Sequence, residues 1–166
     1  MNDICRDTAL VRLSDAAGFE TEDTKKPRDT AWLNQIIDET TTMDDLVEIL
    51  ERGFFTCRID DDGDIVVRDL INFYIHTAAA GLLLSASFDF REGVDSEVMR
   101  SVARAANAGD WLVRFRLGGE DEQFLRAEHY IVMRGGITAR NFGHTVRRYI
   151  NTVHEQLRGV HREVMA

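Results

Sequence analysis

Residues 54–90 read FFTCRIDDDGDIVVRDLINFYIHTAAAGLLLSASFDF, and apolar residues alternate with polar ones along most of this segment. Successive side chains of a β-strand point to opposite faces of a sheet, so a period of two predicts strands with one apolar face. That face needs a cover, whereas the other can meet water. The Asp61-Asp62-Gly63 sequence is typical of a hairpin turn. The strands that we expect are residues 54–60, residues 64–68 resuming over 71–77 after a break or bulge at Asp69-Leu70, and residues 82–90.

The rest of the chain contains helical patterns around these strands. Thr42 and Asp45 have the spacing of a capping box, which predicts the start of a helix that Gly53 ends. A second helix is expected from Asp95 or Ser96 through Asn107, and a third, with apolar residues three or four apart, from Thr138 to about residue 163. Two further strands are expected over residues 111–117 and 124–133. The order α-β-β-β-α-β-β-α predicts an α+β fold with an antiparallel sheet.

The 166 residues suit one domain. Residues 1–29 are polar and contain the only proline, so we expect a flexible N-terminal arm followed by a single α+β domain over residues 30–166. Trp32, Ile36 and Ile37 have helical spacing, which indicates a short helix or an ordered lead-in to the domain.

The net charge of −9 opposes binding to nucleic acid and to anionic membranes, because both carry the same sign. No apolar run approaches the roughly 20 residues that cross a bilayer, and the N-terminus has no signal-peptide pattern. Two cysteines, Cys5 and Cys57, do not form a disulfide scaffold and fit a reducing compartment. We therefore expect a cytoplasmic protein with no membrane or nucleic-acid partner.

Motifs for catalysis and metal binding fail on inspection. Asp60-Asp61-Asp62-Gly63-Asp64 resembles a calcium loop, but Arg58 would occupy the first ligand position. The five histidines form no HExxH pair or ligand cluster. Cys57 has no base beside it in sequence, and its inward strand position favours burial. We expect no enzymatic activity, no metal and no cofactor.

The most specific polar feature is a basic stripe on the last predicted helix. Residues 134–166 contain six Arg and two Glu. A solvated outer face is the ordinary interpretation, and a docking face for an acidic protein segment or a second subunit is the alternative. The residues that we predict as partner or anion contacts are Arg140, His144, Arg147, Arg148 and Arg158.

Gly135, Gly136 and Thr138 precede this helix. A tight turn with Thr138 as the helix cap is the simpler interpretation, and an anion held by free N–H groups at the helix start is the alternative.

Several of these motifs together resemble the YbjN family of bacterial sensory transduction regulators. They are Gly53-Phe54-Phe55, Asp62-Gly63-Asp64-Ile65, Leu82 to Phe88, Ser96-Glu97 leading to Asn107, and Gly135-Gly136-Ile137-Thr138 with Phe142. The resemblance covers about residues 40–159. The family often has two Asn three residues apart at the end of the second helix, and here Arg104 replaces the first while Asn107 matches the second.

The resemblance implies a twisted antiparallel sheet similar to that of type III secretion chaperones, no enzymatic activity, and a regulatory or chaperone-like protein that is commonly a homodimer. Our main hypothesis is that a sheet edge or an apolar groove binds a segment of a partner protein. The alternative hypothesis is a regulator that binds a small molecule or anion through the Gly135-Gly136 turn and the basic face of the last helix.

Overall fold

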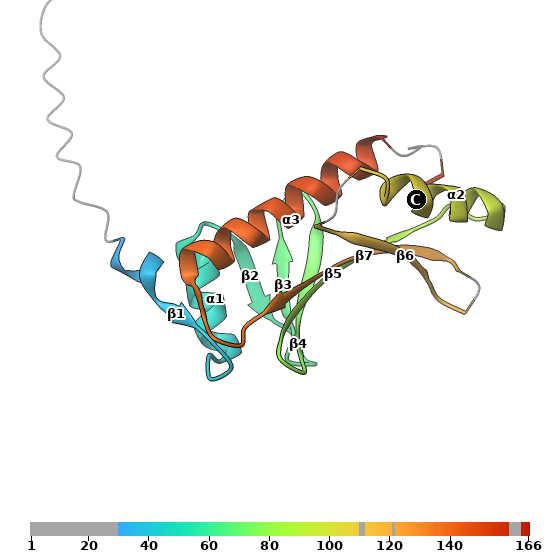
Figure 1. Ribbon diagram of the computed structural model, residues 1–166. Helices are drawn as coiled ribbons and strands as arrows, with labels where there is room; N and C mark the ends of the chain where they lie inside the picture. Colours follow the sequence, from blue (N-terminus) through green and yellow to red (C-terminus); the bar gives the residue numbers. More distant parts are fainter. Residues whose placement is uncertain (1–29, 110–111, 121, 160–163) are drawn as a thin grey trace, which may run out of the picture.

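The computed structural model describes residues 30–109, 112–120, 122–159 and 164–166. The predicted N-terminal arm over residues 1–29 lies outside these residues. The helices of the described part are α1 (Met43–Arg52), α2 (Ser96–Ala106), α3 (Ala139–Gly159) and the short 3-10 helix η1 (Ala31–Asn34) (Figure 1).

The main sheet has six strands, all antiparallel to their neighbours, in the spatial order β2-β3-β4-β5-β7-β6. A separate two-stranded sheet pairs β1 (Ile36–Ile37) with β8 (Ile137–Thr138). The α+β class with an antiparallel sheet is therefore confirmed. The six strands are β2 (Thr56–Ile59), β3 (Ile65–Arg68), β4 (Asn72–Ala78), β5 (Gly81–Asp89), β6 (Arg114–Gly118) and β7 (Phe124–Val132).

One predicted strand is wrong. The segment 64–77 forms two antiparallel strands, with Arg68 opposite Asn72 and a reversal between them, so the first meander has four strands rather than three. The register places Val67 opposite Phe73, an odd-numbered residue opposite an odd-numbered one. Odd residues therefore share a face whether the chain runs straight or turns back, and the alternation cannot distinguish the two cases.

The spacing of Trp32, Ile36 and Ile37 indicated a short helix or an ordered lead-in to the domain. The segment is ordered, but its helical part is limited to the 3-10 helix over residues 31–34. Ile36 and Ile37 form β1 and pair with Thr138 and Ile137 at the start of α3.

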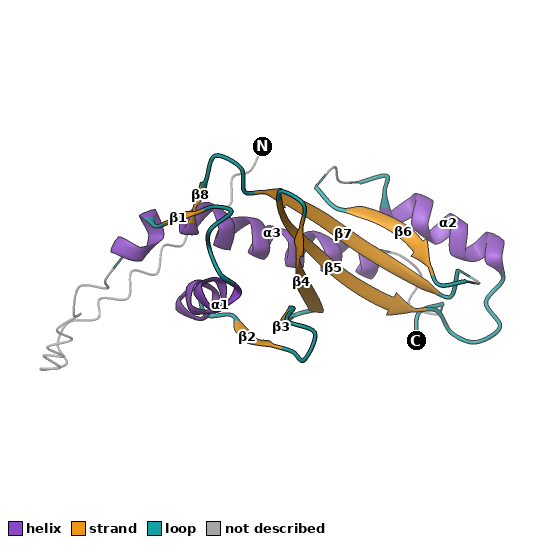
Figure 2. Ribbon diagram, turned by 90° about the horizontal axis from the view of Figure 1, so that it is seen from below, coloured by secondary structure: helices purple, strands orange, loops and turns teal. Residues whose placement is uncertain are grey.

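Helix α3 covers one face of the sheet and forms the centre of the core (Figure 1). Tyr149 of this helix is fully buried, its ring contacts Phe73 edge-on at 5.2 Å between centroids, and its hydroxyl donates to the Ala127 carbonyl at 2.9 Å. The inward parity predicted for the strands agrees with burial of Phe73, Leu84 and Leu125. The opposite face of the sheet has no described helix over it (Figure 2).

Candidate functional site

The five basic side chains predicted as a contact face lie along α3 but do not meet at one site. Arg140, His144 and Arg147 border a groove at the start of α3. His144 and Arg148 border a second hollow beside Leu112. Arg158 lies far along the helix, in a hollow near the C-terminus. A single anion site that uses all five is therefore not formed by this arrangement.

Arg147 already has two partners. Its Nη1 atom donates to the Asp69 carboxylate at 2.8 Å, and its guanidinium carbon lies 4.4 Å from the centre of the Phe55 ring. A cation above an aromatic face is attracted by the ring quadrupole. Arg147 thus joins α3 to the turn between β3 and β4 and to the start of β2.

The groove at this place has a volume of about 260 Å³ and is largely apolar. We call it the Phe55 groove. It lies between α3, η1 and the connection from α1 to β2. It is lined by Trp32, Leu33, Gly53, Phe55, Ala139, Arg140, Gly143, His144 and Arg147.

Phe54, beside this groove, has an unusual conformation and an unusual exposure. Its φ angle is 66°, and its side chain is 82% exposed. Gly53 ends α1 as predicted, but with φ −80°, so Phe54 takes the left-handed position that usually holds glycine. The Phe55 N–H donates to Leu50 O at 3.0 Å, which closes the helix end around Phe54.

Leu70 is a second exposed apolar residue at the same end of the sheet. Phe54 precedes β2 and Leu70 follows β3, and these strands pair with Thr56 opposite Arg68. Leu70 is 61% exposed and adjacent to Asp69, the partner of Arg147. We call Phe54 and Leu70 the groove rim.

Asn107 has a structural role that the sequence did not reveal. Its Nδ2 donates to Phe115 O at 2.7 Å and to Ala103 O at 2.8 Å, and its Oδ1 accepts from Phe115 N at 2.9 Å. The side-chain amide therefore pairs with one residue of the outer strand β6 as a neighbouring strand would. It holds the end of α2 against that edge.

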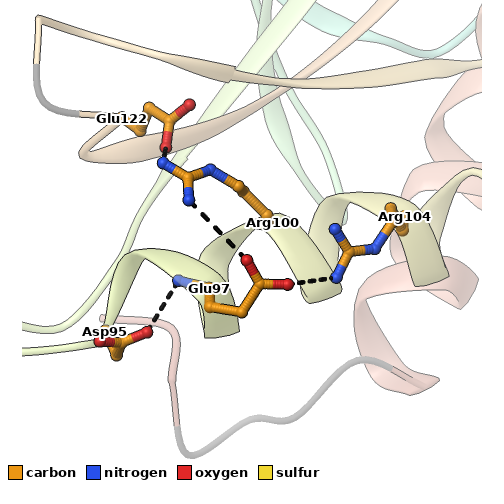
Figure 3. A network of polar contacts seen from close by, with 5 residues as sticks. All are labelled: Asp95, Glu97, Arg100, Arg104 and Glu122. Carbon is orange, nitrogen blue, oxygen red and sulfur yellow. Dashed lines mark hydrogen bonds and ion pairs between the residues drawn. The ribbon is translucent and has the colours of Figure 1, made fainter.

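Arg104, which occupies the position where the family often has Asn, makes an ion pair of 2.8 Å with Glu97, about two turns earlier in α2 (Figure 3). Hydrogen bonding from Arg104 lowers the pKa of Glu97. Arg100 reaches Glu122 at 3.0 Å, before β7, and Asp95 caps the helix by accepting from the Glu97 N–H at 2.8 Å. This network is solvent-exposed, and most of its contacts lie within α2 and its cap, while the Arg100–Glu122 pair reaches the segment before β7.

The Gly135-Gly136 turn is separated from α3 by β8. The Gly136 N–H donates to Met133 O at 2.9 Å, and the Ala139 N–H at the helix start donates to Gln35 O at 2.8 Å. Thr138 accepts from the Asn141 N–H at 3.2 Å, as expected of a cap. These N–H groups have partners within the chain, which favours the turn-and-cap interpretation.

Cys57 lies inward, as predicted, with its thiol 3.9 Å from Val47 O. Burial, and then the nearby Glu51 charge, raise the pKa of this thiol to about 11. Among the described residues, no group of three or more His, Cys, Asp or Glu could hold a metal ion. No helix in the described ranges is long and apolar enough to cross a membrane.

A model of the YbjN family, described as "Putative bacterial sensory transduction regulator", matches residues 42–161. The chain belongs to the YbjN family. The resemblance drawn from the turn glycines and the Gly-Gly-Ile-Thr motif is thus confirmed, over nearly the predicted range. The description of the family supports a regulatory role for the chain.

A solved structure confirms the fold. The chain is similar to the protein in "Crystal structure of YbjN, a putative transcription regulator from E. coli", with a TM-score of 0.68 and 15% sequence identity. The match covers 80% of this chain and 99% of that one. A search of curated protein sequences finds no match.

Sequence reasoning missed the groove rim, although Gly53-Phe54-Phe55 was among the motifs that carried the resemblance. An apolar residue directly after a helix-ending glycine looks like the first residue of a strand. The backbone angle shows that Phe54 is in the left-handed region, and the exposed fraction of its side chain shows that it is turned to solvent.

Proposed function

We propose that the protein is a non-enzymatic regulator of chaperone-like character that binds a segment of a partner protein at the Phe55 groove and its rim. The groove is next to β2, an outer strand of the sheet. A partner segment in extended form would run along this edge, with backbone hydrogen bonds supplying affinity and side chains in the groove supplying specificity. The other outer strand, β6, already has Phe115 paired with Asn107.

Phe54 carries the proposal. A left-handed conformation costs a non-glycine residue about 1–2 kcal/mol, and Phe54 is 82% exposed, so little packing offsets that cost. Glycine would satisfy the helix end better. Strained residues cluster at binding sites, and a large aromatic side chain presented to solvent is a frequent anchor of protein interfaces. A docked partner would bury the Phe54 ring, and the packing gained in the complex would offset the cost of the left-handed conformation.

The test is a substitution that separates stability from binding. Phe54→Gly removes the strain and the anchor together, so we expect the free energy of unfolding to rise by about 1 kcal/mol while partner capture falls. A photo-reactive amino acid at position 70, in the full chain, would crosslink bound proteins in bacterial lysate. Capture that is lost in Phe54→Gly but retained in Val98→Ala, an exposed apolar site on α2, would support the groove. Equal capture by Phe54→Gly and the unsubstituted chain would refute it.

A second candidate function is binding of a small anion with an aromatic part. Arg140 and His144 border the groove that Trp32 lines, which places two basic groups beside an aromatic ring. The Gly135-Gly136 turn contributes little to anion binding, because the Gly136 N–H already donates a hydrogen bond to Met133 O. A thermal-shift screen with nucleotides and phosphorylated metabolites tests this function, because ligands that bind the native state raise Tm. A shift that Arg140→Gln does not reduce would count against it.

Homodimer formation and a cytoplasmic location complete the proposal. Sedimentation of the purified chain over a range of concentrations tests the first. Fractionation of the bacterium tests the second.

A further inference from the structure

Figure 2 shows the face of the sheet that is turned away from α3. The side chains on this face form an arrangement of charge and apolar surface that the Phe55 groove does not involve. We call it the open face. One row of paired residues runs straight across it from β2 to β6. In order, the row is Arg58, Val66, Tyr74, Ser85, Glu128 and Arg114.

Arginines stand at both ends of the open face. Arg58 and Arg68 are exposed on β2 and β3. On the other side, Arg114 and Arg116 are exposed on β6, and Arg126 of β7 is half-buried. A chain with net charge −9 thus concentrates five arginines on one face of its sheet.

Few carboxylates balance these arginines. Arg116 holds the Glu128 carboxylate through two hydrogen bonds of 2.7 Å, which lower the pKa of Glu128. Asp64 lies 2.7 Å from His76. Among the described residues, Arg58, Arg68 and Arg114 form no salt bridge within 4 Å, although the charge of Arg114 also acts on Glu128. Arg126 lies over the Phe124 ring, and its buried Nε atom has no hydrogen-bond partner among the described residues. A guanidinium group without a salt bridge, such as that of Arg58, Arg68 or Arg114, can bind a carboxylate with two parallel hydrogen bonds.

The centre of the open face is aromatic and apolar. Tyr74 is 44% exposed and stacks on His76, with 5.7 Å between ring centroids. Tyr130 and Val132 on β7 are 42% and 56% exposed. Leu83 lies between them and His76, because it pairs with both His76 and Tyr130.

We propose that the open face binds an acidic segment of a partner protein that crosses the strands in extended form. Neighbouring strands lie about 4.8 Å apart, so the five steps from β2 to β6 span about 24 Å. At about 3.3 Å per residue, seven or eight extended residues cover that distance. The segment would carry carboxylates at both ends, opposite the arginines, and an aromatic or branched apolar residue in the middle, opposite Tyr74 and Leu83.

A nucleic acid fits the same surface less well. Every nucleotide carries a phosphate, including those that would lie over the apolar centre, and a longer strand would continue onto the acidic remainder of the chain. A short protein segment can place its charges only at its ends. This surface is distinct from the groove of the proposed function, and neither depends on the other.

The experiment compares two synthetic seven-residue peptides of identical composition. One has two glutamates at each end and a Val-Phe-Val centre, and the other has the four glutamates in the centre and the apolar residues at the ends. Both are titrated into the full-length chain, with amide chemical shifts recorded to locate binding. We expect the end-charged peptide to bind at least fivefold more tightly and to shift amides of β4, β5 and β7. Equal affinity for the two peptides, or shifts confined to α3, would overturn the proposal.

Variants give the second arm of the test. Arg58→Gln combined with Arg114→Gln is expected to weaken binding of the end-charged peptide about tenfold, whereas the single change Arg148→Gln, on the exposed face of α3, leaves the affinity unchanged. Phe54→Gly is also expected to leave it unchanged, so failure of the groove and failure of the open face are distinguishable. Tighter binding of a single-stranded oligonucleotide than of the peptide, or protection of the same amides by self-association at high concentration, would each refute the assignment.

Discussion

Replacement of Asn107 tests how the family-motif position acts. The side chain makes hydrogen bonds to both the N–H and the C=O of Phe115, at 2.9 and 2.7 Å, and a third to Ala103 O. Asn107→Leu keeps approximate size and removes all three. A typical intramolecular hydrogen bond contributes about 1 kcal/mol. Ala103 O retains its bond from the Asn107 N–H at 3.2 Å, so the third contributes least. We expect a loss of about 2 kcal/mol in the free energy of unfolding, from two bonds of about 1 kcal/mol each.

Asn107→Asp adds a pH dependence with a defined sign. A carboxylate would face the carbonyl oxygens of Phe115 and Ala103, so the folded state favours the protonated form and raises the pKa of the new group above its unfolded value of about 3.9. Below that unfolded value the protonated group can donate one hydrogen bond, and the loss relative to the unsubstituted chain is smallest. As pH rises from the unfolded pKa to the folded pKa, the loss in free energy of unfolding grows, and it reaches its full size above the folded pKa.

Urea unfolding followed by circular dichroism, at pH 4 and at pH 7, measures both effects. A loss of about 2 kcal/mol corresponds to a Tm lower by about 4–8 °C for a domain of this size. The difference in free energy of unfolding between Asn107→Asp and Asn107→Leu should be smaller at pH 4 than at pH 7. If Asn107→Leu unfolds at the same urea concentration as the unsubstituted chain, Asn107 does not hold β6 against α2, and our account of this position is wrong.

Other predictions concern the sheet, the groove and the thiol. A Cβ atom at Gly81 would lie 1.9 Å from Ile131 O, so Gly81→Ala should separate β5 from β7 and lower stability by more than about 3 kcal/mol; a normal Tm would contradict this close approach. A double-mutant cycle of Arg147→Met and Asp69→Ala should give a coupling energy of about 0.5–1 kcal/mol at low salt that shrinks in 1 M NaCl, and a coupling of zero at low salt would mean that the ion pair contributes nothing. Burial raises the pKa of the Cys57 thiol to about 11, so in a Cys5→Ser variant this thiol should react with iodoacetamide far more slowly at pH 8 than a free cysteine does. The reaction rate should still rise between about pH 9 and 10. A rate that reaches a plateau near about pH 8.5 would show that the thiol is exposed.

Much of the secondary structure follows from local patterns. The Thr42 and Asp45 pair was expected as a capping box, and both of its hydrogen bonds are formed, with Asp45 N donating to Thr42 at 3.2 Å and Thr42 N donating to Asp45 at 3.0 Å. Such pairs lie within one helical turn, so spacing alone brings them together. The inward parity of the strands is equally local, because it depends only on the alternation of side chains.

The order of strands could not be predicted in the same way. After α2 the hairpin of β6 and β7 could join the sheet by either strand, since both alternate. The structure pairs β7 with β5 over nine residues, whereas β6 pairs over five with β7 alone. The longer strand forms more hydrogen bonds in the middle of the sheet, and this advantage appears only when strands distant in the chain are compared.

The candidate sites also combine features that local sequence predicts with features that depend on distant parts of the chain. Sequence identified the basic residues of α3, but it could not tell that Arg147 would be held by Asp69, 78 positions earlier in the chain. It also could not place Arg58 and Arg114 at opposite ends of one row, because that row depends on five pairings between strands.

By itself, the sequence determined the class of fold, the inward residues, the helix starts and the family, since each depends on neighbours within a few positions. Tertiary structure alone decided the reversal at Asp69, the left-handed Phe54 and the arginine-flanked open face. The reversal and the open face arise from hydrogen bonds between paired strands, and the Phe54 conformation arises from the backbone geometry at the end of α1. A periodic pattern of apolar and polar residues encodes neither.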